Sequence, residues 1–291
     1  MGGSKTENAA AAPVVVALLT YAVSALAQGP QSDSTLRFEV ASIKPSASST
    51  PFGISRPTNG VVRSRGAELR RLVAYAYGID PASHAPQPQG GPDWIDEDLF
   101  AVEARGPADM SWADGRRMMQ TLLRERFGLK VRVETRERPA YVLVTARTDG
   151  RLGAGLVPSK TDCGKYSDVL ARTGRLDAAR EVTTDCGLRS GGGLGGGQLQ
   201  MRGRGTIREF IPVIARSPDI DRPVFDRTGL TGTYDVDFVW APARSGPGAA
   251  EAVGVVSIFS ALQEQLGLKL QPRREPMDVV VIVSVDRLIP N

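Results

Sequence analysis

Acidic side chains form the two groups of residues in this sequence whose type and spacing could support catalysis. One group precedes an apolar segment at residues 99–104, and the other surrounds the alternating apolar positions of residues 234–240. The acidic residues are Asp93, Asp96, Glu97, Asp98, Asp226, Asp235 and Asp237. Two carboxyl groups a few ångströms apart can act as acid and base in glycoside cleavage. A hydrolase acting on polysaccharide is therefore one hypothesis, and ordinary acidic surface turns are the alternative.

Other kinds of catalytic site find little support in the sequence. His84 is the only histidine and lies in a Pro- and Gln-rich segment, which argues against multi-histidine metal sites and limits histidine-based triads. Gly191, Gly193 and Gly196 match a dinucleotide-binding spacing, but they lie in a run of glycines that no expected strand precedes. We expect no catalytic residue set, no cofactor and no metal site, and we favour a protein that is not an enzyme.

Five residues in two regions that combine a turn with a strand are candidate binding residues. They are Trp94, Asp93, Asp226, Thr228 and Tyr234. An aromatic side chain beside a tight turn can contact a partner protein. The alternative is a structural role, because Asp and Thr side chains hydrogen-bond turn backbone and neighbouring glycines permit positive φ.

The two cysteines, Cys163 and Cys186, lie in near-identical Thr-Asp-Cys-Gly contexts. In an exported protein such a pair is expected to form a disulfide. The alternative is a nucleophilic thiol, which would need a base, and the chain has one histidine. Closing a loop of this length would stabilise the fold by roughly 3 kcal/mol.

The first 27 residues are typical of a signal peptide. An apolar, small-residue stretch at residues 9–27 ends in Ala25-Leu26-Ala27, an A-x-A cleavage signature. Cleavage near Ala27 would leave a periplasmic or secreted protein. A retained N-terminal anchor is the alternative, although this stretch is shorter than the ~20 residues of a spanning helix. We expect no membrane span in the mature chain.

Charge and composition restrict the partners further. The chain has 36 Lys and Arg against 32 Asp and Glu, for a net charge of +4, and these charges are interleaved along the sequence. Nucleic-acid binding usually requires a concentrated basic patch, so we expect no nucleic-acid partner. A hydrophobic content of 41% is ordinary for a chain with a packed core.

The elements that must position these residues follow an internal repeat. Phe127-Gly128-Leu129-Lys130 and Leu266-Gly267-Leu268-Lys269 each close an expected helix and open an expected strand. Earlier in each copy, helical spacing of apolar residues predicts helices over residues 69–76 and 207–214. The apolar residues are Leu69, Leu72, Val73, Ala76, Ile207, Phe210, Ile211 and Ile214.

Strands complete each expected copy. Residues 36–44 form an additional opening strand, and residues 234–240 alternate apolar and polar side chains, as in a strand with one buried face. After each Gly-Leu-Lys motif we expect two strands joined by a turn, at Arg138-Pro139 in one copy and Glu275-Pro276 in the other. Thr206 and Glu209 match a capping box that would begin the second-copy helix.

The predicted fold class is therefore α+β: two copies of a small two-layer sandwich, each with two helices on a mostly antiparallel sheet. The expected organisation is a signal peptide at 1–27, a first repeat with an extra N-terminal strand at 28–147, and a second repeat at 198–291. Residues 148–197 are expected to form an irregular, Gly-rich linker closed by the disulfide.

Several segments resemble an uncharacterised family of exported proteins, a domain of unknown function expanded in Solibacter and other Acidobacteria. They are Phe38-Glu39-Val40-Ala41-Ser42-Ile43-Lys44-Pro45, Gly91-Pro92-Asp93-Trp94, Leu122-Leu123-Arg124-Glu125-Arg126-Phe127, Arg222-Pro223-Val224-Phe225-Asp226-Arg227-Thr228-Gly229-Leu230-Thr231-Gly232 and Ala261-Leu262-Gln263-Glu264-Gln265-Leu266-Gly267-Leu268. The resemblance implies an envelope or secreted location and brings no known activity. In element order, each repeat is also similar to the short N-terminal domain of secretins and TonB-dependent receptors, a module used for protein contacts.

Three functional hypotheses remain after these considerations. The leading one is a non-catalytic, exported binding or interaction module whose partner is an envelope protein or glycan. The second is the carboxylate-dependent hydrolase, and the third is a structural spacer.

Overall fold

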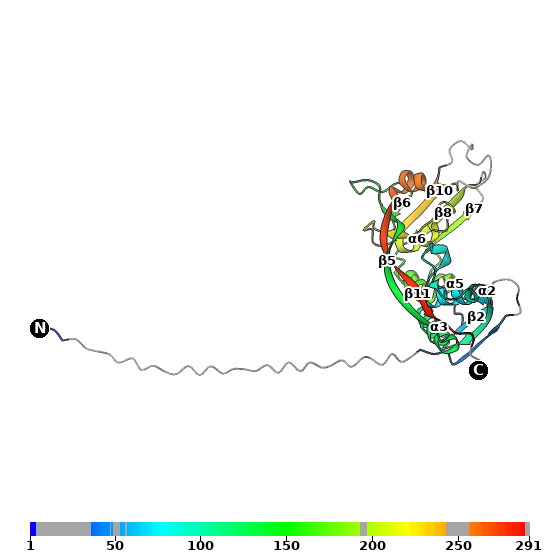
Figure 1. Ribbon diagram of the computed structural model, residues 1–291. Coiled ribbons are helices and arrows are strands. Elements are labelled where there is room, and N and C mark those ends of the chain that lie inside the picture. The colour runs from blue at the N-terminus through cyan, green and yellow to red at the C-terminus, as the bar shows by residue number, and fades with distance from the viewer. Residues whose placement is uncertain are drawn as a thin grey trace. The chain divides into compact units, whose positions relative to one another are not determined.

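The computed structural model describes residues 1–3, 36–46, 48, 53–55, 57–192, 197–242 and 256–288 (Figure 1). The chain divides into two compact units, Met1–Ser34 and Thr35–Asn291. Only residues 1–3 of the first unit are described, so the rest of the predicted signal peptide lies outside the described residues.

The second unit is a mixed α+β structure with three sheets, which confirms the α+β part of the predicted fold class. The sheets have strand orders β1-β4-β2, β6-β10-β8-β7 and β3-β11-β5-β9. The strands are β1 (Val40–Pro45), β2 (Val61–Glu68), β3 (Gln89–Gly90), β4 (Leu99–Arg105), β5 (Lys130–Thr145), β6 (Leu156–Pro158), β7 (Gly187–Gly192), β8 (Leu199–Gly205), β9 (Val224–Asp226), β10 (Tyr234–Trp240) and β11 (Leu268–Ser284). The helices are α1 (Leu69–Ala76), α2 (Trp94–Glu97), α3 (Trp112–Phe127), α4 (Gly164–Thr173), α5 (Leu176–Val182), α6 (Ile207–Ile214) and α7 (Ile258–Ala261), with a 3-10 turn η1 (Pro81–Ser83) and a π-helical turn η3 (Leu262–Leu266).

Two hydrophobic cores define two lobes. In the first lobe, sheet β1-β4-β2 packs against α1, α2 and α3. In the second lobe, sheet β6-β10-β8-β7 packs against α6, α7 and η3. The apolar side of each sheet is therefore buried by helices, as expected for a two-layer α+β arrangement.

The long strands β5 and β11 form an antiparallel ribbon that contributes to both cores (Figure 1). Val280 and Ile282 are buried in the first core, whereas Leu143 and Leu270 are buried in the second. At one end β3 pairs in parallel with β11, and at the other β9 pairs in parallel with β5. The two lobes therefore share a continuous hydrogen-bonded connection.

Three prolines lie inside this ribbon, and the expected turns at Pro139 and Pro276 are wrong. Pro139 is opposite Arg274, Pro276 is opposite Glu137 and Pro272 is opposite Tyr141. The amide of Tyr141 donates to Pro223 on the far side of β5 from β11. Residues 137, 139 and 141 of β5 are two apart, so their backbone nitrogens all point away from β11. The residues opposite them on β11 likewise point their nitrogens away from β5, so none of the three prolines lies where the ladder needs an N–H. Proline is tolerated in a strand at such positions.

Several local patterns have the structure that their periodicity predicts. Leu69, Leu72, Val73 and Ala76 are all buried on α1. Helix α6 begins with the predicted capping box, in which Thr206 and Glu209 bond each other's backbone amides. Strand β10 alternates buried and half-buried residues along its whole length.

The segment at residues 148–197 contains more regular structure than the expected irregular linker. Strands β6 and β7 form the two edges of the second-lobe sheet. Helices α4 and α5 lie between these two strands in the sequence. Their small core contains the disulfide together with Tyr166 and Ala179. These short elements are ordered by sheet pairing and the disulfide, which local sequence patterns do not reveal. Residues 193–196 of the Gly-rich run lie outside the described residues.

Glycines in the left-handed region end both helices that precede the ribbon. Gly128 has φ +53° and Gly267 has φ +68°. A Cβ on Gly128 would lie 2.5 Å from the Asp286 carboxylate, which can move, whereas one on Gly267 would lie 2.8 Å from the backbone nitrogen of Gly153. We expect Gly128→Ala to cost roughly 1–2 kcal/mol of unfolding free energy and Gly267→Ala to cost more. Urea denaturation of both variants tests this order, and a larger loss in Gly128→Ala would contradict it.

Candidate functional site

The solvent-facing side of the second-lobe sheet carries the most organised group of charged side chains among the sequence candidates. Asp235 and Asp237 alternate with buried residues on β10 and therefore lie on the same face. In the antiparallel register, Asp235 is opposite Arg204 and Asp237 is opposite Arg202 of β8. We call these four residues the charge ladder.

Each carboxylate of the charge ladder binds an arginine directly. Arg204 Nε lies 2.7 Å from Asp235 Oδ1, and Arg202 Nη2 lies 2.6 Å from Asp237 Oδ2. Gln200 donates a further hydrogen bond of 2.7 Å to Asp237. The ladder lines a shallow cavity of about 300 Å³, whose rim includes the exposed apolar Val157. The face thus presents fixed polar groups beside an apolar side chain.

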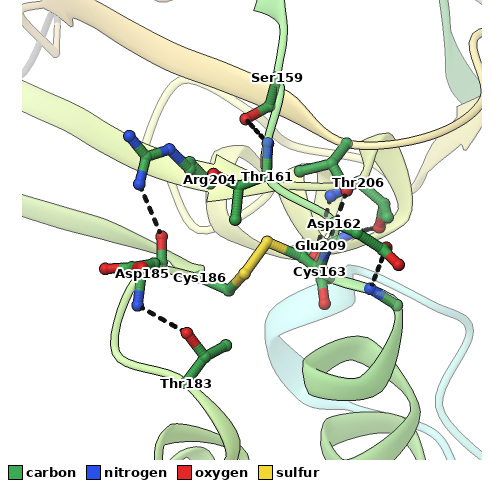
Figure 2. Close-up of a disulfide and its surroundings, with 12 residues drawn as sticks. Ser159, Thr161, Asp162, Cys163, Thr183, Asp185, Cys186, Arg204, Thr206 and Glu209 are labelled. Carbon is green, nitrogen blue, oxygen red and sulfur yellow. Dashed lines mark hydrogen bonds between the residues drawn. A yellow bond between two sulfur atoms is a disulfide. The ribbon is translucent and has the colours of Figure 1, made fainter.

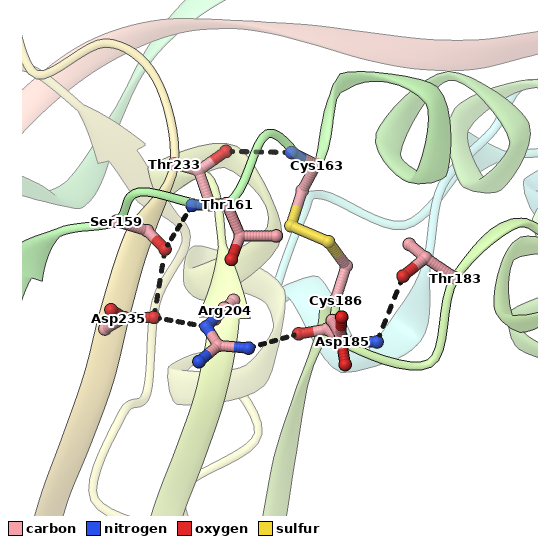
Figure 3. Close-up of polar contacts among 9 residues, drawn as sticks. All are labelled: Ser159, Thr161, Cys163, Thr183, Asp185, Cys186, Arg204, Thr233 and Asp235. Atoms are coloured by element: carbon pink, nitrogen blue, oxygen red, sulfur yellow. Dashed lines mark hydrogen bonds and ion pairs between the residues drawn. A yellow bond between two sulfur atoms is a disulfide. The ribbon is translucent and has the colours of Figure 1, made fainter.

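Hydrogen bonds connect the charge ladder to the segments that carry the disulfide (Figure 3). Ser159 Oγ donates to Asp235 at 3.1 Å, and the same Oγ accepts from the amide of Thr161. On the other side, Arg204 reaches the backbone carbonyl of Asp185 at 3.4 Å. Asp235 and Arg204 are therefore held by both cysteine-containing segments.

The predicted disulfide between Cys163 and Cys186 is confirmed (Figure 2). Both cysteines are buried, and the amide of Cys163 donates to Thr233 Oγ1 just before β10. Gly203 lies where β7 approaches β8 closely, and a Cβ there would lie 2.1 Å from the Gly187 carbonyl oxygen. The disulfide thus fixes the edge strand β7, which belongs to the same sheet as the charge ladder.

The electrostatics of Asp237 do not suit a catalytic acid. Burial raises the pKa of Asp237, but hydrogen bonds from Arg202 and Gln200 and the positive charge of Arg202 outweigh burial, leaving the pKa below its ordinary value. A general acid in glycoside cleavage needs a raised pKa. Asp237 is therefore ionised at neutral pH and acts as a hydrogen-bond acceptor.

We expect Arg202→Gln to raise the pKa of Asp237, because it removes a hydrogen bond and a positive charge. Because the pKa of Asp237 is lowered in the native protein, this ion pair stabilises the fold at pH values above the unfolded-state pKa of Asp237. That stabilisation is lost as pH falls through the folded-state pKa. Carboxyl ¹³C NMR titration measures the shift, with Arg208→Gln on the exposed side of α6 as the control. An unchanged Asp237 titration in Arg202→Gln would contradict this account.

The first acidic group is also engaged by arginines. Asp96 accepts two hydrogen bonds from Arg70, at 2.6 and 2.8 Å, and Asp98 pairs with Arg287. The hydrogen bond from Arg70 lowers the pKa of Asp96, and burial opposes it only in part. Asp93 and Glu97 are exposed. Asp96 therefore does not have the raised pKa that a catalytic acid requires.

Trp94 is half-buried in the first lobe. Its ring stacks on Phe127 at a centroid distance of 6.5 Å, and the Arg287 guanidinium lies 4.7 Å from its centroid. These contacts give Trp94 a packing role, and the neighbouring Asp93 is the more exposed of the two.

The remaining three candidates lie in the second lobe. Asp226 accepts from both the amide and the hydroxyl of Thr228, at 2.9 and 2.8 Å, which shapes the turn after β9. Tyr234 belongs to the second hydrophobic core and is 7% exposed. The five candidate binding residues are thus divided between two lobes and do not form one site.

The arginines that bind these carboxylates are the residues that sequence reasoning missed. Arg202 and Arg204 are two residues apart, as are Asp235 and Asp237. This matching spacing of opposite charges could have predicted that the two strands pair. Arg70 lies on a helix in a different part of the sequence from Asp96, and no local pattern connects them.

Comparison with known proteins identifies one family. The model of a family described as a protein of unknown function, DUF3738, matches residues 70–285, from the start of α1 to the end of β11. No curated protein and no solved structure matches this sequence. Among the described residues, no helix is both long and apolar enough to cross a membrane.

Proposed function

We propose that this chain, which belongs to the DUF3738 family of proteins of unknown function, is an exported, non-catalytic module that binds a protein or glycan in the bacterial envelope. The charge ladder is the observation that carries the proposal. Each of its carboxylates already binds a guanidinium group, so the face offers oriented donors and acceptors in place of a free acid and base. Polar surfaces of this kind recognise partners through complementary hydrogen bonds and charge.

Location outside the cytoplasm is part of the proposal. The mature chain would begin after cleavage near Ala27 and remain periplasmic or be secreted. A buried disulfide is compatible with this location, because disulfides persist in oxidising compartments.

The two lobes support descent from one duplicated module. In each, a central strand (β4 or β10) lies between a strand earlier in the chain and a strand that leads into a helix. The residues quoted above as similar to exported Acidobacterial proteins agree with an envelope role. If each lobe is one copy of a repeat similar in element order to the short N-terminal domain of secretins, as expected from the sequence, protein contacts are favoured on that analogy alone.

A charge-reversed ladder tests the binding role. In the double variant Arg202→Asp with Asp237→Arg, the pair keeps its mutual attraction while the polarity presented to a partner is reversed. We expect an unchanged melting temperature and at least tenfold weaker binding to the peptidoglycan fragment, envelope polysaccharide or envelope protein that stabilises the wild type in a thermal-shift screen. Arg208→Gln is the control. Equal binding by the double variant and the wild type would place recognition elsewhere.

Turnover separates this proposal from the hydrolase hypothesis. We expect no release of reducing ends when the oxidised mature protein is incubated with the same polysaccharides. Release that is lost in Asp235→Asn or Asp96→Asn, with folding intact, would replace the binding module with a carboxylate-dependent hydrolase. A structural spacer predicts no stabilising ligand in the screen.

A further inference from the structure

A cavity of about 470 Å³ opens on a different part of the molecule from the charge ladder. Its walls come from residues 53–54, the end of α1, the segment after it, the start of α3 and the segment that follows α6. The lining side chains that carry the argument are Tyr75, Ile79, Trp112, Arg71, Arg116 and Arg216. This volume is in the range of sites that hold small organic molecules.

Arg116 is held in a defined position at this cavity. Its guanidinium carbon lies 4.2 Å from the centroid of the Trp112 ring. It also lies against Gly78, where φ is +74° and a Cβ would lie 2.8 Å from Arg116 Nη1. The Trp112 ring in turn contacts Gly174 so closely that a Cβ there would lie 2.4 Å from Trp112 Cε3. The side chains of Arg116 and Trp112 are therefore both held in place before any ligand binds.

The charge of the cavity is predominantly positive. Three guanidinium groups line it, and Asp80 is the one acidic residue among the described residues that do so. Asp80 caps η1 by accepting from the amide of Ala82, and Arg71 pairs with Glu68 at 3.3 Å. No ion pair involves Arg216 within the described part of the chain, and its side chain is exposed. Arginine stays protonated at any physiological pH, so the positive field is permanent.

We propose that this cavity binds a small organic anion in which a flat ring carries an acidic group. Guanidinium groups bind carboxylate, sulfonate and phosphate oxygens with oriented hydrogen bonds. The Trp112 and Tyr75 rings and Ile79 supply an apolar wall for the flat portion. The inference extends the proposed binding function to a second site and does not depend on the charge ladder.

The position of Arg216 gives such a ligand a structural consequence. Arg216 directly follows Ala215, whose carbonyl oxygen lies 3.1 Å from Nε2 of His84. The cavity thus lies where a segment after α6 of the second lobe meets α1 and α3 of the first. A ligand that contacts Arg216 and Trp112 together joins both lobes and is expected to raise the melting temperature.

Titration with 8-anilinonaphthalene-1-sulfonate tests the inference on the full, oxidised chain. This probe combines flat rings with a sulfonate, and N-phenyl-1-naphthylamine has the same rings without the charge. We expect saturable binding of one sulfonate probe per chain, with emission excited through tryptophan. The uncharged analogue is expected to bind at least tenfold more weakly.

Two variants locate the bound probe. Arg216→Gln changes an exposed side chain and should weaken sulfonate binding about tenfold, whereas Arg208→Gln on α6 should leave it unchanged. Gly78→Ala should displace Arg116 and weaken binding as well. Equal affinity for the two probes, or wild-type affinity in both Arg216→Gln and Gly78→Ala, would overturn the inference. Neither result bears on the charge ladder, which the reversed double variant tests separately.

Discussion

Replacing Cys163 and Cys186 together with alanine is expected to lower the free energy of unfolding by about 3 kcal/mol. The disulfide joins residues separated by 23 positions and therefore restricts the unfolded chain. The cluster around it contains only two other buried residues in the described structure, Tyr166 and Ala179. Because little else holds α4 and α5 in place, we also expect faster amide exchange in these helices. Chemical denaturation and hydrogen exchange measure the two effects.

Reduction provides the matched control for the disulfide. A reducing agent should destabilise the wild type to a similar extent and have no further effect on the double alanine variant. Exchange in α1, which belongs to the first core, should change less than exchange in α4. Equal stability of the oxidised wild type and the double variant would show that packing alone holds this segment.

Arg70→Leu is expected to lower the free energy of unfolding by roughly 2–3 kcal/mol. The guanidinium of Arg70 binds both Asp96 oxygens and also donates to the carbonyls of Pro88 and Gly90, at 2.6 and 3.0 Å. One side chain therefore joins α1, α2 and the strand β3, which pairs with the end of β11. The side chain is 23% exposed, so water replaces these bonds only in part.

The neighbouring arginine provides the control for this variant. Arg71 is 45% exposed and makes one ion pair of 3.3 Å with Glu68, so Arg71→Leu should cost less than about 1 kcal/mol. The pKa of Asp96 is lowered in the native protein, so its pair with Arg70 stabilises the fold at pH values above the unfolded-state pKa. That stabilisation is lost as pH falls through the folded-state pKa. The difference between wild type and Arg70→Leu should therefore shrink in acid. Equal losses for the two leucine variants would contradict the role assigned to Arg70.

The parts of the fold that could be predicted depend on neighbours in the sequence. The helices at Leu69 and Ile207 follow from apolar spacing, and the start of α6 follows from the Thr206–Glu209 capping box. The alternation along β10 identified its buried face correctly. The solvent-exposed face of β10, which carries Asp235 and Asp237, was therefore predictable. The arginine partners of these two residues were not identified.

The prolines show where this reasoning fails. Arg138-Pro139 and Glu275-Pro276 predict turns locally, yet both lie within continuous strands. The reason is the register of β5 with β11, which places each proline where no ladder amide is needed. That register joins residues such as Thr135 and Asp278, which are 143 positions apart and hydrogen-bonded at 2.9 Å.

The sequence by itself determined the α+β class, the principal helices, the alternation of β10 and the pairing of its two cysteines. Only the tertiary structure decided that β5 and β11 join the two lobes, that Asp235 and Asp237 each bind an arginine, and that Trp112, Arg116 and Arg216 line one cavity. Periodicity and capping act within a few residues and can be read locally. Strand register and side-chain pairing depend on which distant surfaces are buried together, because a shift of one residue reverses the face that every side chain occupies.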